Sequence, residues 1–322
     1  MAEAAGVSTA TASKAINGRG RISAATREKV LESARELGFI ATSGPGRRAF
    51  TTVGVLATDL NGRFALPILN GLEDTLGSEQ SAVFLCNARG DDLRERHQLE
   101  ALLDRRVSGI VVIGRPEERD PVGQDLPVPV VYVHTRSRDP RDTSLVVDNA
   151  QGARLQIEHL VDSGRTRIGR IGGPAAELIV GERRVGEAEA LSARGLDLTA
   201  AAGSGLWRSA WGRSATARLL EEHPDLDAIA CDSDEIALGV IDQLKAQSRR
   251  IPDDIAVVGF GNYEAIATNS DPQITSVDMN LELLGRKAAR VLHDAMEGEP
   301  LEPGVTALPC ELVARASTTS GL

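Results

Sequence analysis

The chain has 322 residues, of which 42% are hydrophobic and 25% are charged, and its net charge at pH 7 is −10. Its apolar content excludes a disordered chain, and its length suggests two or three domains. Because no apolar run approaches the ~20 residues of a membrane span and the chain begins without an apolar signal segment, we expect a cytoplasmic protein with no membrane partner.

The charge is distributed unevenly along the chain. Residues 1–50 hold eight Lys and Arg against four Glu, a net of +4, which leaves −14 for the remainder. A basic head on an acidic body favours a nucleic-acid contact confined to one end of the molecule, because the body is repelled by phosphates.

The first residues, 1–39, predict a small helical head. Ser8 is a good N-cap for a helix that begins at Thr9, and Gly6 suits a tight turn before it. The residues that precede this turn supply only about the last turn of an earlier helix, so we expect that first helix to be short. Residues expected on the buried side of the Thr9 helix are Ala12, Ala15 and Ile16, with Val7 filling the small core.

A further helix is predicted from the N-cap Ser23 to about Leu37, with Gly38 ending it. Its inward positions are Val30, Leu31, Ala34 and Leu37. Together these segments predict a helix-turn-helix arrangement. A small helical cap without a nucleic-acid role is the alternative that the residue chemistry leaves open.

If the head binds DNA, short polar side chains on the outer face of the Thr9 helix would reach base edges, and basic side chains would reach phosphates. The predicted DNA-binding residues are Ser8, Thr9, Ala10, Thr11, Ser13, Lys14, Asn17, Arg19, Arg21, Arg47 and Arg48. The last two belong to a predicted linker, residues 40–51, whose Gly44-Pro45-Gly46 resists helix formation.

From residue 52 onward, short apolar runs alternate with helical segments. The predicted strands are residues 52–57, 82–86, 109–113, 129–133, 144–148, 167–171, 227–231 and 255–260. The predicted helices are residues 65–78, 92–106, 150–163, 182–194, 212–222, 234–247 and 281–296. This alternation is typical of βαβ units, and the number of strands predicts an α/β fold with two doubly wound parallel-sheet subdomains and a ligand crevice between them.

The residues from 5 to 39, AGVSTATASKAINGRGRISAATREKVLESARELGF, resemble the DNA-binding head of the lactose-repressor (LacI/GalR) family of bacterial transcription regulators. The resemblance continues in family order through GVLATDLNGRFALPILNGLED, LCNARGD, RRVSGIVVIG, VDNAQGA, HLVDSGRTRIGRIGGP, CDSDEIALG, IPDDIAVVGFGN and ITSVDMN. It therefore covers essentially the whole chain.

This resemblance implies a homodimeric repressor whose affinity for double-stranded operator DNA is controlled by a small-molecule effector, such as a sugar or another polar metabolite. It also implies two periplasmic-binding-protein-like subdomains joined by three crossovers. We expect the first subdomain to span residues 52–148 and 280–302, and the second to span residues 149–279 and 303–322. The family's hinge helix inserts a Leu into the minor groove, whereas residues 40–51 contain no Leu.

Effector contacts in the family come from strand-end loops that face the crevice. The matching residues are Asn61, Phe64, His134, Arg136, Arg183, Trp207, Ser233 and Asn262. A guanidinium grips paired oxygens and an aromatic plane stacks on a sugar or purine. The acid that the family has after VGF is Gly261 in this chain, and the usual Asn is Ser233. This loss of a carboxylate acceptor weakens the case for a plain monosaccharide.

Each of these assignments has a structural alternative. Arg183 and the adjacent Arg184 could both lie on a solvated helix face. Trp207 could pack in a core or an interface. His134 could be a strand-end histidine whose hydrogen bonds are satisfied within the protein.

An enzyme is the first rival interpretation. GFGNYEA (259–265) departs from the dinucleotide-binding spacing, and the chain has no P-loop, zinc-binding HExxH motif or nucleophile elbow. The five His residues lack metal-ligand spacing, and Cys86, Cys231 and Cys310 favour three unpaired thiols in a reducing compartment. The sequence therefore predicts no enzyme, no cofactor and no metal.

The second rival is a periplasmic solute-binding protein without a DNA role, which would share the two-lobed body. Such a protein should carry a signal peptide and no helix-turn-helix, whereas this chain has the opposite features.

Overall fold

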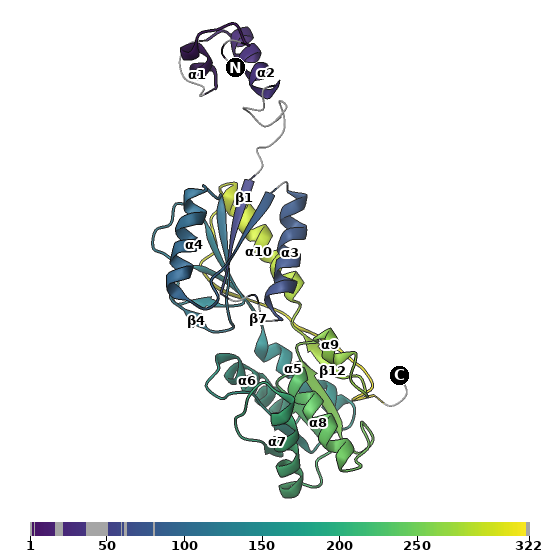
Figure 1. Ribbon diagram of the computed structural model, residues 1–322. Coiled ribbons are helices and arrows are strands. Elements are labelled where there is room, and N and C mark those ends of the chain that lie inside the picture. Colours follow the sequence, from purple (N-terminus) through teal and green to yellow (C-terminus); the bar gives the residue numbers. More distant parts are fainter. Residues whose placement is uncertain are drawn as a thin grey trace. The chain divides into compact units, whose positions relative to one another are not determined.

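The computed structural model describes residues 2, 4–16, 22–36, 51–58, 60, 63–79 and 81–319 (Figure 1). The chain divides into two compact units, a head from Met1 to Phe50 and a body from Thr51 to Leu322.

The head contains helices α1 (Thr9–Ile16) and α2 (Ala24–Glu36), which pack against each other. Both begin at the predicted serine caps, because Ser8 Oγ accepts from the Thr11 amide at 3.1 Å and Ser23 Oγ accepts from the Thr26 amide at 3.2 Å. The core between the helices consists of small residues, which allow the backbones to approach closely: Ala5, Ala12, Ala15, Val30 and Ala34 are buried.

The body is an α/β structure with two six-stranded sheets, which define a first and a second lobe. The first sheet has the order β13-β7-β5-β3-β1-β2, and all its pairings are parallel. Its strands are β1 (Thr51–Ala57), β2 (Ser81–Asn87), β3 (Gly109–Ile113), β5 (Val130–Val133), β7 (Thr143–Val147) and β13 (Gly304–Leu308). A separate two-stranded sheet pairs β4 (Glu118–Arg119) with β6 (Arg136–Ser137).

The second sheet has the order β14-β12-β11-β10-β8-β9 and is parallel except for the pairing of β14 with β12. Its strands are β8 (Ile168–Ile171), β9 (Ala200–Ala201), β10 (Ala228–Cys231), β11 (Ala256–Phe260), β12 (Thr275–Asp278) and β14 (Glu311–Val313). Alternate residues of β10 enter opposite cores, since Ala228 and Ala230 belong to one apolar cluster and Ile229 and Cys231 to another. Both faces of a parallel sheet are thereby covered.

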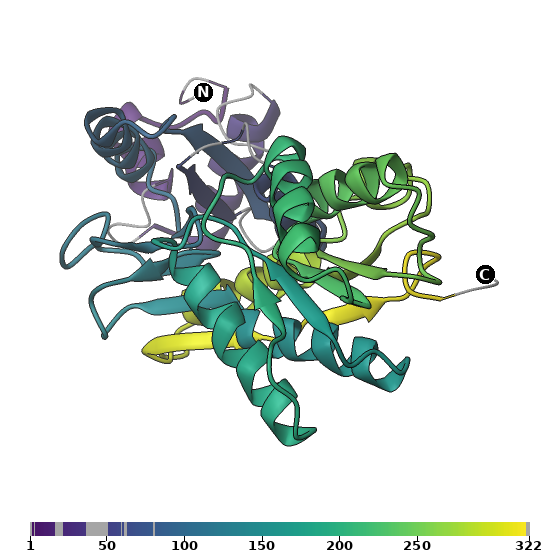
Figure 2. The ribbon, with the colours of Figure 1, turned by 90° about the horizontal axis from the view of Figure 1, so that it is seen from below.

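Helices cover both faces of each sheet (Figures 1 and 2). The first lobe contains α3 (Ala65–Ser78), α4 (Asp92–Asp104) and α10 (Leu281–Met296). The second lobe contains α5 (Asn149–Asp162), α6 (Leu178–Ala193), α7 (Ser209–Glu222), α8 (Asp234–Ala246) and α9 (Glu264–Ala267). The helix pairs α3 with α10, α5 with α6, and α7 with α8 are in extensive contact.

The chain passes between the lobes three times, after β7, after β12 and after β13. The last passage differs from the expected boundary at residue 303. Strand β13 pairs with β7, with Val305 opposite Ser144, so residues 304–308 belong to the first sheet. Three of the five residues of β13 are exposed, and this edge strand therefore lacks the continuous apolar run that marked the central strands.

Among the described residues, no helix is both long and apolar enough to cross a membrane. Cys231 and Cys310 are buried, Cys86 is partly exposed, and all three thiols are free. The predicted linker, residues 40–51, lies outside the described residues except for Thr51, which begins β1.

Candidate functional site: the head surface and the inter-lobe pocket

The predicted DNA-reading residues that the structure describes lie on the open side of α1. Thr9, Ala10, Ser13 and Lys14 are exposed, on the side opposite the buried Ala12 and Ala15. The hydroxyls of Ser8 and Thr11 are hydrogen-bonded to each other at 2.9 Å at the start of the helix. Asn17, Arg19, Arg21, Arg47 and Arg48 lie outside the described residues.

A pocket lies between the two lobes of the body. From the first lobe it is lined by residues that follow β5 and end β7, and from the second lobe by the start of α6. The lining residues are Pro116, His134, Thr135, Arg136, Val146, Val147, Asn149, Leu178, Ile179 and Glu182. Because the carboxyl ends of parallel strands are the usual ligand-binding edge of such sheets, this position agrees with the predicted crevice.

Arg183 is buried beside this pocket rather than lying on a solvated helix face. Its Nε and Nη2 donate to Asn149 Oδ1 at 3.1 and 2.9 Å, and its Nη1 donates to the carbonyl oxygen of Asp232. Burial lowers the pKa of the guanidinium to about 10. The neighbouring residue Arg184 is the one that is exposed to solvent.

The position of Arg183 depends on a close approach of two helices. A Cβ atom at Gly186 of α6 would lie 1.8 Å from the carbonyl oxygen of Ala150 in α5. Any larger residue at that position would therefore separate the helices. This contact brings Arg183, one turn earlier in α6, within hydrogen-bond distance of Asn149.

His134 is a buried histidine whose hydrogen bonds are not all satisfied. Its Nε2 has no hydrogen-bond partner among the described residues, and its backbone is left-handed with φ +63°. Its ring centre lies 5.0 Å from that of Phe64. Burial, followed by the charge of Arg183, lowers its pKa to about 4, so the imidazole is neutral at physiological pH. A neutral ring nitrogen at the pocket can accept or donate a hydrogen bond to a ligand.

Two ion pairs connect the lobes around the pocket. Arg136 of the first lobe pairs with Glu182 of α6, whose other oxygen accepts from Asn149 Nδ2 at 3.0 Å. Arg63, just before α3, pairs with Glu235 of α8. Both pairs are partly buried, so their Coulomb attraction is screened less than at an open surface.

Trp207 lies beside Arg183, with the guanidinium carbon 5.9 Å from the ring centre. Its Nε1 donates to both carboxylate oxygens of Glu177, at 2.9 and 3.0 Å. The indole is only partly buried, so one part of the ring packs in the lobe while another is accessible. Both the stacking and the packing interpretations of Trp207 remain compatible with this position.

Ser233 and Asn262 are used within the second lobe. Ser233 is buried and caps α8, because its Oγ accepts from the Ile236 amide at 3.2 Å. Asn262 Nδ2 donates to Asp278 at 2.8 Å and its Oδ1 accepts from Arg315 at 2.7 Å. These bonds occupy the groups that were predicted to contact an effector. Asn61 lies outside the described residues.

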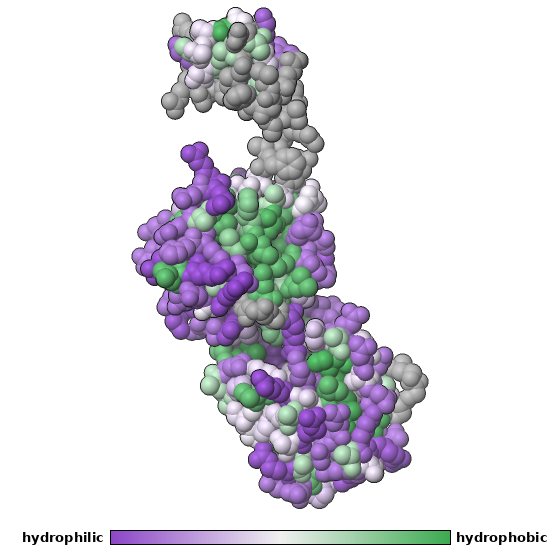
Figure 3. Space-filling view, viewed as in Figure 1, coloured by the Kyte–Doolittle hydropathy of each residue, from purple (hydrophilic) through white to green (hydrophobic). Residues whose placement is uncertain are grey.

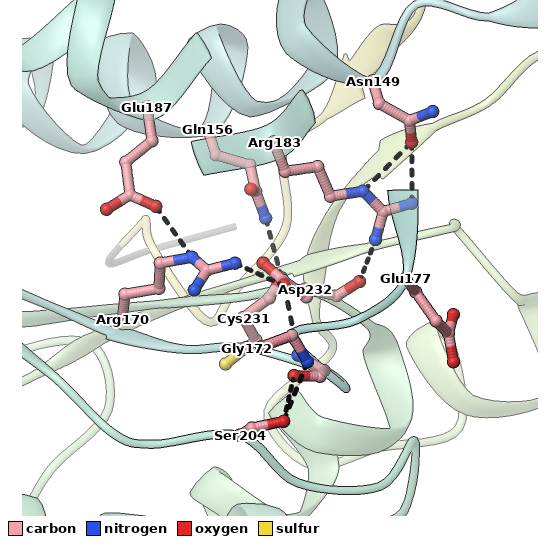
Figure 4. Close-up of polar contacts among 12 residues, drawn as sticks. Asn149, Gln156, Arg170, Gly172, Glu177, Arg183, Glu187, Ser204, Cys231 and Asp232 are labelled. Carbon is pink, nitrogen blue, oxygen red and sulfur yellow. Dashed lines mark hydrogen bonds and ion pairs between the residues drawn. The ribbon is translucent and has the colours of Figure 1, made fainter. Parts of the chain in front are cut away.

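Sequence reasoning missed Asn149 and Asp232, which bind Arg183 (Figure 4). It also missed Glu182, which pairs with Arg136. Asn149 and Asp232 could have been found, because each is a polar residue just after a predicted strand, at the ligand-binding edge. Among the described residues, no group of three or more His, Cys, Asp and Glu side chains forms a metal site.

Apolar residues also gather on one outer face of the first lobe (Figure 3). At the edge strand β2, Phe84 is 48% exposed and Leu85 is 47% exposed, on opposite faces of the sheet, and Leu66 at the start of α3 is 64% exposed. An edge strand with exposed apolar side chains is typical of a protein–protein interface.

Two family models match the chain. A model described as bacterial regulatory proteins, lacI family, matches residues 1–41, and a model described as a periplasmic binding protein-like domain matches residues 157–318. Because the first match coincides with the helical head and the second lies in the body, the two models agree with the division of the structure.

Curated relatives match over nearly their whole length. The transcriptional regulator CelR of Thermobifida fusca is 32% identical, with 98% of this chain and 96% of the relative covered. Catabolite control protein A of Priestia megaterium is 31% identical, with 99% and 98% covered. The first of these relatives is named as a transcriptional regulator and the second as a control protein.

Solved structures of similar proteins have the same architecture. A complex of the regulator CelR with cellobiose has a TM-score of 0.68 and 32% identity, with 98% of each chain covered. A lac repressor dimer bound to operator and an anti-inducer has a TM-score of 0.74 and 26% identity, with 99% of this chain and 98% of that chain covered.

Proposed function

The chain belongs to the lacI family of bacterial regulatory proteins and is a DNA-binding transcriptional regulator, and on this premise we propose the roles of its individual residues. The body binds a small polar effector between its lobes, and the occupied and empty bodies differ in their effect on the head. The protein acts as a repressor in the cytoplasm, where its operator DNA is found. The helix-turn-helix head argues against a solute-binding protein without a DNA role.

The effector role is supported above all by the hydrogen-bond acceptors that surround Arg183. A buried guanidinium is costly unless its hydrogen bonds are made, and this one is held by Asn149 and by the carbonyl oxygen of Asp232. It lies beside a pocket that contains the unpartnered Nε2 of His134. A preorganised cation next to an unsatisfied ring nitrogen is suited to a ligand that carries several oxygens.

The chemistry of the pocket favours a sugar or a similar polar metabolite. In the lining, Leu178 and Ile179 of α6 offer apolar surface and Arg136 and His134 offer polar contacts. Outside the lining, Phe64 lies against His134, and Arg183, with Trp207 beside it, is bonded to the lining residue Asn149. One similar structure is a complex with cellobiose, which supports this ligand class. The roles of Asn61, Ser233 and Asn262 stay predictions from the resemblance.

The two inter-lobe ion pairs can link ligand binding to closure of the lobes. A ligand that contacts Arg136 or Asn149 changes the surroundings of Glu182, which binds both residues. The relative stability of open and closed lobes then depends on the ligand. Such a difference couples the pocket to the head by a free energy of typically ~1–3 kcal/mol.

We further propose that two copies of the chain associate through the exposed apolar side chains of β2 and α3. The exposed apolar side chains are Phe84 and Leu85 of β2 and Leu66 of α3. Because Phe84 and Leu85 are adjacent in the strand, they point to opposite faces of the sheet, and both sides of this edge present apolar surface. A dimer places two heads on one operator, and two α1 helices then contact successive major grooves. A similar protein, the lac repressor, is solved as a dimer on its operator.

A combined binding experiment tests this proposal. The purified chain is used to select DNA from a random duplex library, and its melting temperature is measured with sugars, nucleosides and other polar metabolites. We expect one class of metabolite to raise the melting temperature and to change affinity for the selected DNA. If the chain selects no DNA sequence, or if a stabilising metabolite leaves DNA affinity unchanged, the proposal is contradicted.

A further inference from the structure

Three charged side chains are buried together in the second lobe, next to Arg183 (Figure 4). Arg170 of β8 lies between two acids: its Nε is 2.9 Å from Glu187 Oε2 and its Nη2 is 2.6 Å from Asp232 Oδ2. Each of the three residues is at most 7% exposed. Burying an ion pair together with a second carboxyl group is expensive, and an apolar cluster would stabilise the lobe at least as well. The trio therefore calls for an explanation beyond stability.

Asp232 is held in one position by several independent bonds. Besides Arg170, its Oδ2 accepts from the Gly173 amide at 3.1 Å, and its own amide donates to Ile171 at 3.2 Å. Its carbonyl oxygen accepts from Arg183 Nη1. The other carboxylate oxygen, Oδ1, has no hydrogen-bond partner among the described residues. One oxygen is thus fixed while the other retains its full capacity to accept.

Asp232 is linked to an aromatic ring through Gly173. Gly173, whose amide bonds to Asp232, packs so closely on Trp207 that a Cβ there would lie 2.3 Å from the indole ring. Asp232 directly follows β10, at the carboxyl edge of a parallel sheet, where ligands bind in such folds. An aromatic plane beside a carboxylate acceptor suits a ring with one apolar face and hydroxyl groups at its edge.

We propose that Asp232 is an effector-binding carboxylate that accepts a hydroxyl of an uncharged, carbohydrate-like ring, and that Arg170 positions it. This inference rests on the proposed effector function and deepens it. The carboxylate repels phosphorylated ligands, so it selects for neutral ones. Arg170 keeps the carboxylate of Asp232 in one orientation, and Glu187 binds Arg170 on its other side.

Asp232→Asn removes the charge and keeps the size of the side chain. The full-length chain and the variant are titrated with D-glucose, D-ribose and cellobiose, and with glucose 6-phosphate and ribose 5-phosphate, by calorimetry and by tryptophan fluorescence. We expect a neutral sugar to bind, and Asp232→Asn to raise its Kd ~10- to 100-fold, the range for a hydrogen bond to a charged group. Asp242→Asn, an exposed acid on α8, is the matched control and leaves Kd unchanged.

A second series keeps the inference testable if the variant does not fold. On the unaltered chain, single-deoxy analogues of the bound sugar should include one that binds ~10- to 100-fold more weakly. Where Asp232→Asn folds, the same analogue loses no affinity for it, because the partner is already absent. Arg170→Met should weaken sugar binding, and Arg170→Lys should recover part of the lost affinity. If the two variants have equal melting temperatures, a purely structural role of Arg170 would not produce this difference in affinity.

The outcomes separate this inference from the proposed function. If the chain binds a sugar and Asp232→Asn binds it equally well, or if only phosphorylated sugars bind, Asp232 does not have this role while the effector function stands. If no sugar or sugar phosphate binds, the role of Asp232 is contradicted, whereas the effector function is contradicted only if nucleosides and other polar metabolites also fail to bind. Affinity for a neutral sugar that depends on Asp232 and on one hydroxyl supports both.

Discussion

The guanidinium carbon of Arg183 lies 3.6 Å from the centre of the Phe260 ring. Arg183 comes from α6 and Phe260 ends β11, so this contact joins a helix and a strand that are far apart in the sequence. Phe260 is 1% exposed, and the ring covers one face of the cation while Asn149 and Asp232 bind its edges. Such stacking requires a planar guanidinium, which an ammonium group cannot replace.

Arg183→Lys should therefore reduce effector affinity by about tenfold or more, because a lysine cannot make the forked contact with Asn149 and also stack on Phe260. It should also lower the free energy of unfolding by about 1–3 kcal/mol, since buried acceptors lose their donor. Arg184→Lys, at the exposed neighbouring position, is the control and should change neither quantity. Calorimetry and urea unfolding measure the two effects, and equal affinities for both variants would contradict the assignment.

His134 should make the protein less stable in mild acid. Its pKa is about 4 in the folded chain against 6.5 when unperturbed, so the unfolded state binds more protons between these values. The free energy of unfolding should fall as the pH drops from 6.5 to 4, by at most about 1.4 kcal/mol for each pH unit. His134→Asn, which tolerates the left-handed backbone, should remove this contribution.

The measurement is urea unfolding of the chain and of His134→Asn at pH 7.5, 6 and 5. The stability of the variant relative to the unaltered chain should rise as the pH falls. His97→Asn on the exposed side of α4 serves as the control substitution. A constant difference for His134→Asn would mean that the imidazole is not held neutral.

Glu187 should have the opposite effect. Its burial, only partly offset by Arg170, raises its pKa from 4.5 to about 7. Between these values the folded state holds a proton that the unfolded state has lost, so the free energy of unfolding should decrease as the pH rises through this window. Glu187→Gln cannot ionise, and its stability relative to the unaltered chain should therefore increase from pH 5 to pH 7.5.

The same urea titrations test this prediction, with the exposed Glu221→Gln of α7 as control. Because His134 and Glu187 act in opposite directions over nearly the same range, the unaltered chain alone shows little pH dependence from them. Only the differences between variant and unaltered chain separate the two groups. A stability difference for Glu187→Gln that does not change with pH would show that the carboxyl is ionised throughout.

Lys14 on the exposed side of α1 should contribute to DNA binding through phosphate contact. Lys14→Ala should weaken binding to all sequences and reduce the slope of log K against log salt concentration by about 1. Ser13→Ala should instead change which sequences are selected. Lys287→Ala, an exposed lysine on α10 of the body, is the matched control. Gel-shift titrations at several salt concentrations distinguish these results, and equal slopes for Lys14→Ala and the control would contradict the contact.

The secondary structure of the central elements could be predicted from the sequence because it depends on local chemistry. The serine caps at Ser8 and Ser23, and the apolar run of β3, carry their signals within a few residues. The expected boundaries of α3 and α10 agree with the structure. The strands that were not predicted, such as β9 and β14, are two and three residues long, and β13 is largely exposed. These strands are too short or too polar to show an alternation of apolar and polar residues. Their formation depends on pairing with neighbouring strands.

The residues near the pocket could be predicted only in part. That Arg183 and His134 lie beside the inter-lobe pocket follows from their positions after strands or in the first turns of a helix, together with the family pattern. Which acceptors an arginine meets depends on segments far away in the chain. Arg136 binds Glu182 across 46 residues, and Arg170 binds Asp232 across 62.

The sequence by itself determined the helical head, the alternation of strands and helices, and the family, because each of these is written in local patterns of size, polarity and capping. The tertiary structure decided the partners of the charged side chains. It made Ser233 a helix cap, turned Asn262 toward Asp278 and Arg315, and left one oxygen of Asp232 open. A hydrogen bond requires two atoms within about 3 Å, and only the folding of distant segments onto one another brings them that close.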